Sequence, residues 1–314
     1  MRRGWFRSIA VLAAGVAAAA LSTPAMAEQA GVAVHTAERG AAAVTDYWTA
    51  DRMRAATPLD RLLAAPGQVL GEVARGLPEV LPPVGPQASP STGEPWTGGG
   101  EVAETAGRVF FTFNGNPASC SGNAVTSGNR SVVITAGHCV KYQGSWHTDW
   151  IFVPGYDDGA APYGEWVARQ TLTTPQWEAS EDLNYDVGAA VVEPLNGAHL
   201  TDVVGGQGIA FNQQRGQDMY AFGYPAADPY DGSELIHCAG GTFTDPFTTD
   251  DHAMRCDMTG GSSGGPWFLG FDEATGTGVQ ASVNSFGYTF LPGYMFGPYF
   301  GSEAQALYEQ AASA

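Results

Sequence analysis

The chain has 314 residues, of which 44% are hydrophobic and 15% charged, and its formal net charge at pH 7 is −18. Residues from Glu101 onward carry 24 acidic and 6 basic side chains, so they account for the whole net charge. This acidity excludes nucleic acid as an expected partner, because phosphate binding depends on clustered Lys and Arg. It favours solubility outside the cell.

The N-terminus has the pattern of a secretory signal. Arg2, Arg3 and Arg7 precede an apolar run over residues 9–21, and Ala25-Met26-Ala27 provides the small residues that signal peptidase accepts. No later stretch reaches about 18 uninterrupted apolar residues, the length that a membrane helix needs. We therefore predict a signal peptide over residues 1–27 and a secreted, extracellular protein that is monomeric and does not bind membranes.

Residues 28–104 have the composition of a leader rather than of a core. Ala, Pro and Gly dominate, with short helices predicted over 44–56 and 59–70 and a Pro/Gly-rich linker over 77–100. Between a signal and an enzyme, such a segment is typical of a propeptide that keeps activity off until export. The alternative is a disordered tail without a function in folding or regulation.

Residues 105–314 have the pattern of an all-β domain. Short β-branched and aromatic runs alternate with Gly-rich turns, which is typical of a sandwich or barrel. The predicted strands cover residues 108–113, 131–135, 150–153, 166–172, 187–192, 219–222, 235–238, 278–282 and 286–291. Only residues 302–312 have helical spacing, which predicts a short C-terminal helix.

Four cysteines in an exported chain indicate two disulfides. Their spacing suggests nearest-neighbour pairs, Cys120 with Cys139 and Cys238 with Cys256, although the sequence allows three connectivities. A zinc site is the alternative, but the two pairs lie far apart and neither has the close spacing of zinc ligands. We therefore expect no metal and no cofactor.

The segment from Thr259 to Pro266 contains two adjacent serines with two glycines on each side, and the second serine, Ser263, is a candidate nucleophile. Ser263 needs a base to take its proton and donors for the oxyanion that its attack creates. The backbone N–H groups of Gly261 and Ser263 could supply those donors, because glycine lets a substrate carbonyl approach closely. Alone, the segment could equally be a surface loop.

His138 and Asp186 are the candidate partners of this serine. His138 follows a predicted strand beside Cys139, and a disulfide there would hold a general base in position. Asp186 leads into an apolar strand, where a carboxylate is costly unless it is paired. Each residue alone is more commonly structural, but together they form a possible Ser-His-Asp triad.

Two motifs carry a family resemblance. Thr135-Ala136-Gly137-His138-Cys139 and Gly261-Ser262-Ser263-Gly264-Gly265-Pro266 resemble those of trypsin/chymotrypsin-fold serine endopeptidases. The resemblance implies two six-stranded antiparallel β-barrels with the site between them, and a Cys120–Cys139 bond. It also implies His138 as base, Asp186 as orienter, Ser263 as nucleophile, and an oxyanion hole at Gly261 and Ser263.

Some positions of the sequence differ from the trypsin pattern, and these differences indicate a subfamily. Ser262 stands where trypsins have the Asp that binds a new amino terminus, so that activation switch is expected to be absent. The Gly223-Tyr224-Pro225 segment and residues 254–261 resemble the secreted bacterial branch that includes the glutamyl endopeptidases. In that branch a propeptide is removed.

The resemblance also locates the substrate pocket. Its wall would include Asp257, Met258 and Thr259, and Ser285, Phe286 and Gly287 would pair with the substrate backbone. Asp257 could select Lys or Arg, or it could be a structural acid. Glutamyl specificity is less favoured, because the chain has no histidine after His252.

Other polar residues are interpreted as structural. His147, His199, His237 and His252 are expected at the surface or in turns. Asp157-Asp158-Gly159 could bind calcium, but a solvated turn is favoured because the ligand pattern is missing.

The hypothesis from the sequence is therefore a secreted serine endopeptidase, made as a preproenzyme, that hydrolyses polypeptides. A non-catalytic binding module with the same fold and an esterase with the same triad are the alternatives.

Overall fold

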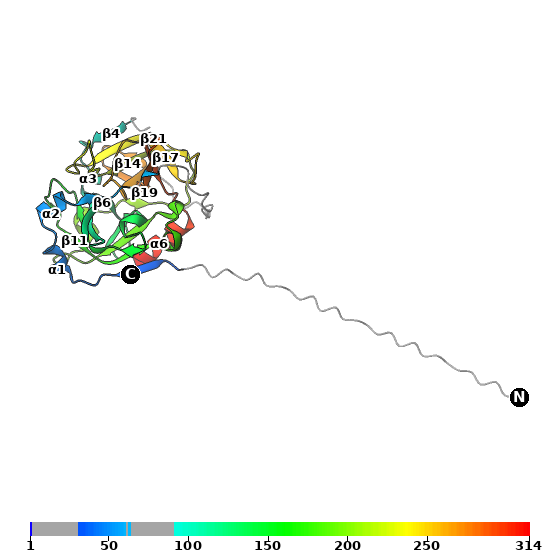
Figure 1. Ribbon diagram of the computed structural model, residues 1–314, viewed down its shortest axis with the longest axis horizontal. Coiled ribbons are helices and arrows are strands. Elements are labelled where there is room, and N and C mark those ends of the chain that lie inside the picture. Colours follow the sequence, from blue (N-terminus) through cyan, green and yellow to red (C-terminus); the bar gives the residue numbers. More distant parts are fainter. Residues whose placement is uncertain (2–30, 61, 64–90) are drawn as a thin grey trace. The chain divides into compact units, whose positions relative to one another are not determined.

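The structure is a computed structural model that describes Met1 and residues 31–60, 62–63 and 91–314. Residues 31–314 form one unit, and residues 1–30 form another of which only Met1 is described. The predicted signal peptide, most of the predicted helix at 59–70 and the first part of the predicted linker lie outside the described residues. Figure 1 shows the unit as a body built mainly of strands.

The first half of the domain is a closed antiparallel barrel of six strands, as the resemblance implied. Around the barrel the strands are β5 (Ala106–Phe113), β6 (Asn116–Val125), β7 (Val132–Thr135), β12 (Gly188–Val192), β11 (Trp166–Thr173) and β10 (Thr148–Pro154). β-Branched and aromatic side chains fill its interior, among them Val109, Phe111 and Val133, all fully buried. Pairing of β11 with both β10 and β12 closes the barrel.

The second half consists of two sheets. One has the order β13 (Gly208–Ile209), β19 (Thr277–Val283), β18 (Pro266–Asp272), β14 (Asp218–Gly223), β15 (Ile236–Gly241), β4 (Ser91–Pro95). The other has the order β16 (Phe243–Thr244), β17 (His252–Arg255), β21 (Leu291–Gly297), β20 (Phe286–Tyr288), β3 (Leu62–Leu63). β15 and β17 contact each other without a ladder, and the Cys238–Cys256 disulfide joins the two sheets there.

The C-terminal helix α6 (Ser302–Ser313) confirms the predicted helix over 302–312. Ala304, Leu307 and Ala311 form its buried stripe, and the helix packs against β12. The other short elements are α3 (Val102–Thr105), η1 (Gly137–Cys139), β8 (Lys141–Tyr142), β9 (Ser145–Trp146), α4 (Pro175–Ser180), η2 (Leu183–Tyr185) and α5 (Leu200–Val204).

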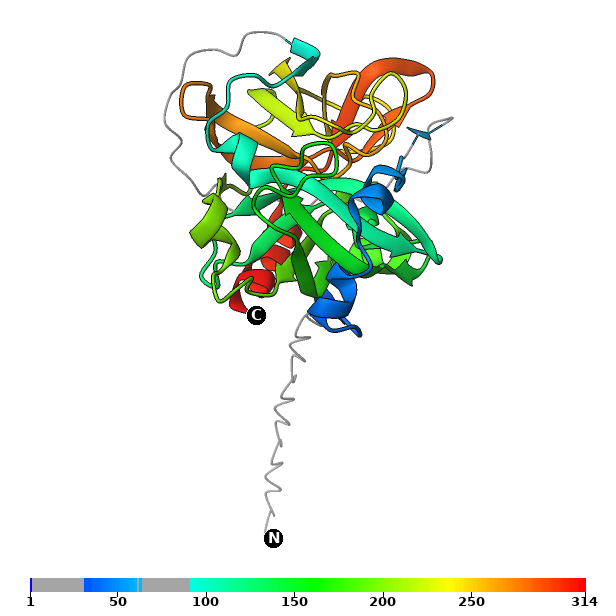
Figure 2. The ribbon, with the colours of Figure 1, turned by 90° about the vertical axis from the view of Figure 1, so that its left-hand side faces the viewer.

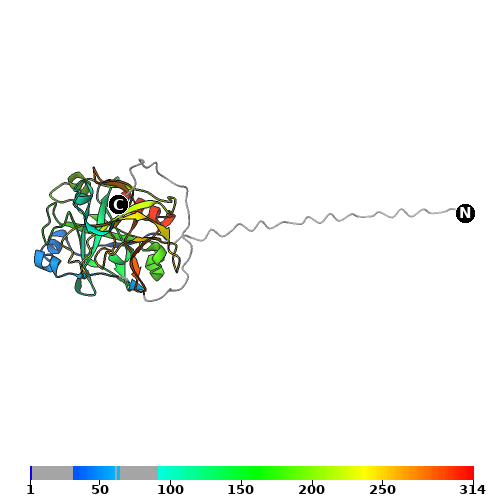
Figure 3. The ribbon, with the colours of Figure 1, turned by 90° about the horizontal axis from the view of Figure 1, so that it is seen from above.

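Residues 31–60 pack against the first barrel. They form β1 (Ala33–Thr36), α1 (Ala41–Thr45), α2 (Ala50–Arg54) and β2 (Thr57–Pro58), and Figure 2 shows this blue segment along the green strands. β1 pairs with β11 and β2 with β6. In Figures 1 and 3, α1 and α2 lie at one side of the barrel and α6 at the other.

Both predicted leader helices differ from the structure. The single helix expected over 44–56 is two short helices, because Thr49 leaves helical geometry and caps α2 by accepting a hydrogen bond from the Arg52 N–H. The described part of the predicted 59–70 helix contains β3 instead, since residues 62–63 pair with β20. A local cap thus divides the first predicted helix, and pairing with β20 outweighs the helical propensity in the second.

Candidate active site

His138 and Asp186 form a fully buried pair. His138 lies in η1, directly after β7, and Asp186 lies between η2 and β12, the neighbour of β7. His138 Nδ1 is 2.7 Å from Asp186 Oδ2, and the His138 backbone N–H donates to Asp186 Oδ1 at 2.8 Å. The carboxylate therefore holds both the ring and the backbone of the histidine, and stabilises the Nδ1–H tautomer.

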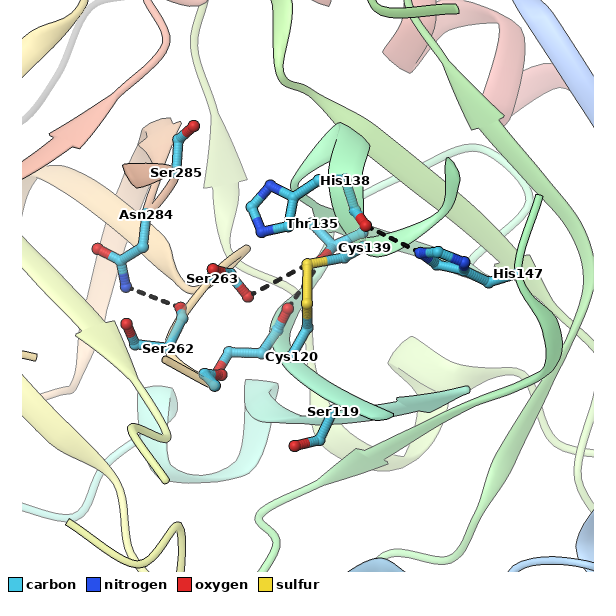
Figure 4. The surroundings of a disulfide bond; sticks show 12 residues. Ser119, Cys120, Thr135, His138, Cys139, His147, Ser262, Ser263, Asn284 and Ser285 are labelled. Carbon is cyan, nitrogen blue, oxygen red and sulfur yellow. Dashed lines mark hydrogen bonds between the residues drawn. A yellow bond between two sulfur atoms is a disulfide. The ribbon is translucent and has the colours of Figure 1, made fainter. Parts of the chain in front are cut away.

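Aromatic N–H groups fix the turn that carries His138. His147 Nε2 lies 2.9 Å from the carbonyl oxygen of His138, and Trp150 Nε1 donates to that of Cys139 at 3.0 Å. Trp177 Nε1 donates in the same way to the Lys141 carbonyl at 2.8 Å. Three ring N–H groups from the core therefore bond to consecutive parts of one turn (Figure 4 includes His147).

The expectation of a surface position for His147 is wrong. Its ring is buried and stacks on Phe111, with centroids 4.2 Å apart. Burial lowers the pKa of His147 to about 3, so the ring is neutral and its Nε2–H donates to the His138 carbonyl. The sequence offered one signal, the aromatic run from Phe110 to Phe113 that forms this pocket.

His252 is also buried, and its pKa is lowered to about 3 by burial and by the charge of Arg215. His199 instead takes part in the N-cap of α5, and His237 is half-buried in β15.

The loop around Ser263 depends on two glycines. Gly261 has φ +96°, and Gly264 has φ +81°. A Cβ on Gly264 would lie 2.1 Å from Thr135 Oγ1, so the loop reaches the His138 strand only without a side chain there. Ser121 ties the loop down by donating from its N–H to the Ser263 carbonyl at 2.7 Å and from Oγ to the Gly261 carbonyl at 2.9 Å.

Ser263 lies beside the disulfide and opposite the histidine. Cys139 Sγ is 3.6 Å from the Ser263 carbonyl oxygen, and Figure 4 shows the His138 ring facing this loop. His138 Nε2 is buried and has no hydrogen-bond partner among the described residues. It is the ring atom left to exchange a proton with a serine hydroxyl or a leaving group.

The backbone N–H of Gly261, predicted as an oxyanion donor, already forms a hydrogen bond in the structure. Its N–H donates to the carbonyl oxygen of Leu59 at 2.9 Å. Leu59 belongs to the predicted propeptide, which no argument from the sequence brought to this position.

Among the described residues, the three predicted pocket residues form no hydrogen bond with His138, Asp186 or Ser263, and they take different positions. Asp257 is exposed, and its Oδ1 accepts from the Tyr230 hydroxyl at 2.7 Å beside Gly93. Met258 is buried in the core of the second half. Thr259 donates from Oγ1 to the Ala227 carbonyl at 2.6 Å.

The three residues predicted at the substrate edge take different positions. Ser285 donates to Asp186 Oδ2 at 2.6 Å, a role that its alignment with the edge did not indicate. Phe286 is buried against Phe296, with ring centroids 5.1 Å apart. Gly287 pairs with Leu62.

Asn284 is a further residue that the sequence analysis did not assign. Its Nδ2 donates to the carbonyls of Phe222 at 2.8 Å and Ser262 at 3.0 Å, and its Oδ1 accepts from Trp267 Nε1 at 2.6 Å. Ser262 itself donates from Oγ to the Thr259 carbonyl at 2.8 Å. These bonds fix the nucleophile loop from its inner side.

Both predicted disulfides are present, Cys120–Cys139 and Cys238–Cys256.

Over 80 residues the chain is 36% identical to the extracellular metalloprotease of Bacillus subtilis, a match that spans 25% of this chain and 24% of that protein. Among the described residues, the group of side chains close enough to bind a metal is Cys120, His138 and Cys139. It does not fit a metal centre, because the two sulfurs are bonded to each other rather than present as thiolates.

Stronger similarity covers more of the chain. The model of the trypsin-like peptidase domain matches residues 120–276. The protease Anisep from Arthrobacter nicotinovorans is 45% identical and aligns with 67% of this chain and 96% of its own, with a TM-score of 0.64. The thermostable serine protease AL20 from an extremophilic microorganism is 44% identical over 68% of this chain and 99% of its own, with a TM-score of 0.65.

A Glu endopeptidase shares the fold at 17% identity, over 71% of this chain and 97% of its own, with a TM-score of 0.56. Within the described residues no helix is long and apolar enough to span a membrane.

The barrel, the buried His–Asp pair beside the serine loop and the matches to proteases lead to one assignment. The chain belongs to the family of proteases with a trypsin-like peptidase domain.

Proposed function

We propose that the protein is a secreted serine endopeptidase that cleaves polypeptides through Ser263, His138 and Asp186. The observation that carries this proposal is the fully buried His138–Asp186 pair, with contacts of 2.7 and 2.8 Å, facing the Ser263 loop. A buried carboxylate bonded to both the ring and the backbone of a histidine is what a general base requires.

Each residue has a defined task in this mechanism. Ser263 Oγ attacks the scissile carbonyl while His138 Nε2 takes the hydroxyl proton, and Asp186 stabilises the resulting imidazolium. The N–H groups of Gly261 and Ser263 bind the oxyanion. His138 then gives its proton to the leaving amine, and water releases the acyl group in the same way.

Export and maturation are part of the proposal. Residues 1–27 serve as signal peptide, and two disulfides suit an oxidising compartment. The predicted boundary at residues 104 and 105 lies after β4, which pairs with β15, and after α3, whose Val102 is fully buried. We therefore place the mature amino terminus before Ser91, and mass spectrometry of the secreted enzyme tests this position.

Labelling with a fluorophosphonate tests the triad. The processed protein should form one covalent adduct on Ser263, and Ser263→Ala should lose both the adduct and peptide hydrolysis while remaining folded. Ser262→Ala is the matched control: it removes a loop bond to the Thr259 carbonyl but leaves Ser263 and His138 in place, so the variant should still form the adduct.

The outcome also separates the alternatives. An unlabelled but folded processed protein would indicate a binding module, and faster turnover of esters with no peptide cleavage would indicate an esterase. Profiling of a peptide library then addresses Asp257: cleavage after Lys or Arg would assign it to the pocket, and any other pattern would leave it a structural acid.

A further inference from the structure

The Leu59 backbone bonds to both sides of the candidate active site. Its carbonyl oxygen accepts from the Gly261 N–H at 2.9 Å, and its N–H donates to the Ser119 carbonyl at 2.9 Å. Ser119 precedes Cys120 in β6, and Gly261 precedes the nucleophile by two residues. Leu59 therefore lies where a substrate carbonyl must lie to use the oxyanion donor.

The residues on either side of Leu59 extend this contact along the cleft. On one side, Thr57 and Pro58 pair in parallel with Ala118 and Ser119. On the other side, Leu62 pairs in parallel with Gly287 of the predicted substrate edge, and Leu63 pairs with the next residue, Tyr288. Residues 57–60 and 62–63, which we call the cleft segment, thus run from the first barrel across the nucleophile loop to β20.

Asp60 lies at the centre of this path. A Cβ on Gly260 would be 2.7 Å from the Cβ of Asp60, so the Asp60 side chain lies against the Gly260 backbone beside the oxyanion donor. Only a glycine at position 260 leaves room for this approach.

A separate set of contacts docks the preceding residues on the barrel. Trp48 is 2% exposed, and its Nε1 donates to the Asp149 carbonyl at 2.6 Å. Val44 and Met53 are buried with it in a shared core that includes Phe110. β1 adds an antiparallel strand to β11 along residues 33–36.

Charge complements these contacts. Arg39 pairs with Asp149 at 2.5 Å, and Arg54 with Asp158 at 3.2 Å. These two arginines thus meet acidic side chains of the domain from Glu101 onward, whose net charge is −18.

We propose that the cleft segment is an inhibitor carried by the chain itself, which occupies the substrate cleft with the Leu59 carbonyl in the oxyanion hole, while residues 33–56 dock it there. This inference rests on the proposed function, since it names what occupies the substrate cleft of the proposed enzyme. His138 Nε2 has no hydrogen-bond partner among the described residues, so no bond joins it to the serine in this structure. In this proposal the segment blocks the cleft as an inhibitor and is not cleaved as a substrate.

The test compares labelling of intact and processed chains on one gel. A tethered segment acts at an effective concentration in the millimolar range, so the intact chain should react with the fluorophosphonate at least about 10-fold more slowly than the processed chain. Equal labelling rates would overturn the inference. Processed protein that is not labelled would instead contradict the proposed function.

Two variants separate the backbone from the side chain. Leu59→Pro removes the N–H that Ser119 accepts and should bring labelling of the intact chain to within about 3-fold of the processed rate. Leu59→Ala keeps both backbone bonds and should remain as slow as the wild type. Slow labelling of a folded Leu59→Pro chain would contradict the proposal.

Hydrogen exchange gives a readout that needs no activity. In full-length Ser263→Ala, the Gly261 amide should exchange slowly, and Leu59→Pro should speed that exchange by about 10-fold or more. A synthetic peptide of residues 55–63 should also slow labelling of the processed enzyme competitively and be recovered intact. Fast exchange in Ser263→Ala, or cleavage of the peptide after Leu59, would overturn the inhibitory role.

Discussion

Ser285 donates a hydrogen bond to Asp186 Oδ2 at 2.6 Å, the same oxygen that lies 2.7 Å from His138 Nδ1. The serine comes from the second half of the domain and the pair from the first barrel. This bond fixes the carboxylate across the two halves, because a hydrogen bond to an ionised group is stronger than one between neutral groups.

Ser285→Ala should therefore lower kcat by about 10-fold, which corresponds to about 1.4 kcal/mol of lost orientation, with little change in KM. Ser285→Thr keeps the hydroxyl and should restore most of the rate. Steady-state kinetics on a peptide substrate measure kcat and KM separately. A change in KM alone would show that Ser285 contacts substrate rather than Asp186.

His147→Phe should preserve the stack on Phe111 but leave the His138 carbonyl without its donor. An unsatisfied buried acceptor costs about 1–3 kcal/mol, so we expect lower stability in urea and a reduced kcat. Phe111→Leu is the matched control, since it disturbs the same pocket and keeps the donor. A kcat that falls equally in both variants would assign the effect to packing.

Histidine burial makes stability sensitive to acid. His252 has a pKa of about 3 in the folded protein against an ordinary value near 6.5, so the unfolded chain binds more protons between these values. Stability from this group is present above pH 6.5 and is lost as pH falls toward 3. His252→Phe should flatten the dependence of the free energy of unfolding on pH in this window, as urea titrations at several pH values would show. An unchanged slope would contradict the assignment.

Trp48→Ala should loosen the leader from the barrel. Removing a buried indole costs about 3–5 kcal/mol, and this one also donates to the Asp149 carbonyl. Limited proteolysis of the intact chain should then cut within residues 31–60 sooner than in the wild type. Val34→Ala alters an exposed side chain in the same segment and should behave like the wild type.

Removing the Cys238–Cys256 bond should destabilise the second half. The disulfide closes a loop with a sequence separation of 18, for which chain entropy predicts about 3 kcal/mol. The double variant Cys238→Ala, Cys256→Ala should unfold at lower urea while its first barrel keeps the His138–Asp186 pair. Loss of labelling at Ser263 before unfolding would show that the bond also shapes the nucleophile loop.

Much of the fold was predictable because alternation and turns are local signals. The strands ending at Thr135 and Val192 were found from β-branched runs, and both lie beside the triad. β6 and β18 were missed, because β6 is rich in Ser, Asn and Gly and β18 begins with Pro266. Their pairing is set by neighbouring strands rather than by their own composition.

The residues of the proposed triad were predicted from motifs, whereas the residues that hydrogen-bond to them were not. The bond from Ser285 to Asp186 spans 99 positions and that from Asn284 to Ser262 spans 22, and no periodicity reports such pairs. The leader was predicted from its composition, but its contact with Gly261 depends on a backbone carbonyl, which every residue has. Composition alone could not indicate it.

The pairing of β1 with β11 has a consequence for the proposed removal of the leader. Residues 170–173 of β11 pair with β12 on one side and with residues 33–36 on the other. Release of the leader would expose the N–H and C=O groups of the alternate residues in 170–173 that face β1, and such a sheet edge is a template for other extended chains. If the leader is removed as proposed, this edge would become available to other extended chains, and the attached leader would cover it until then.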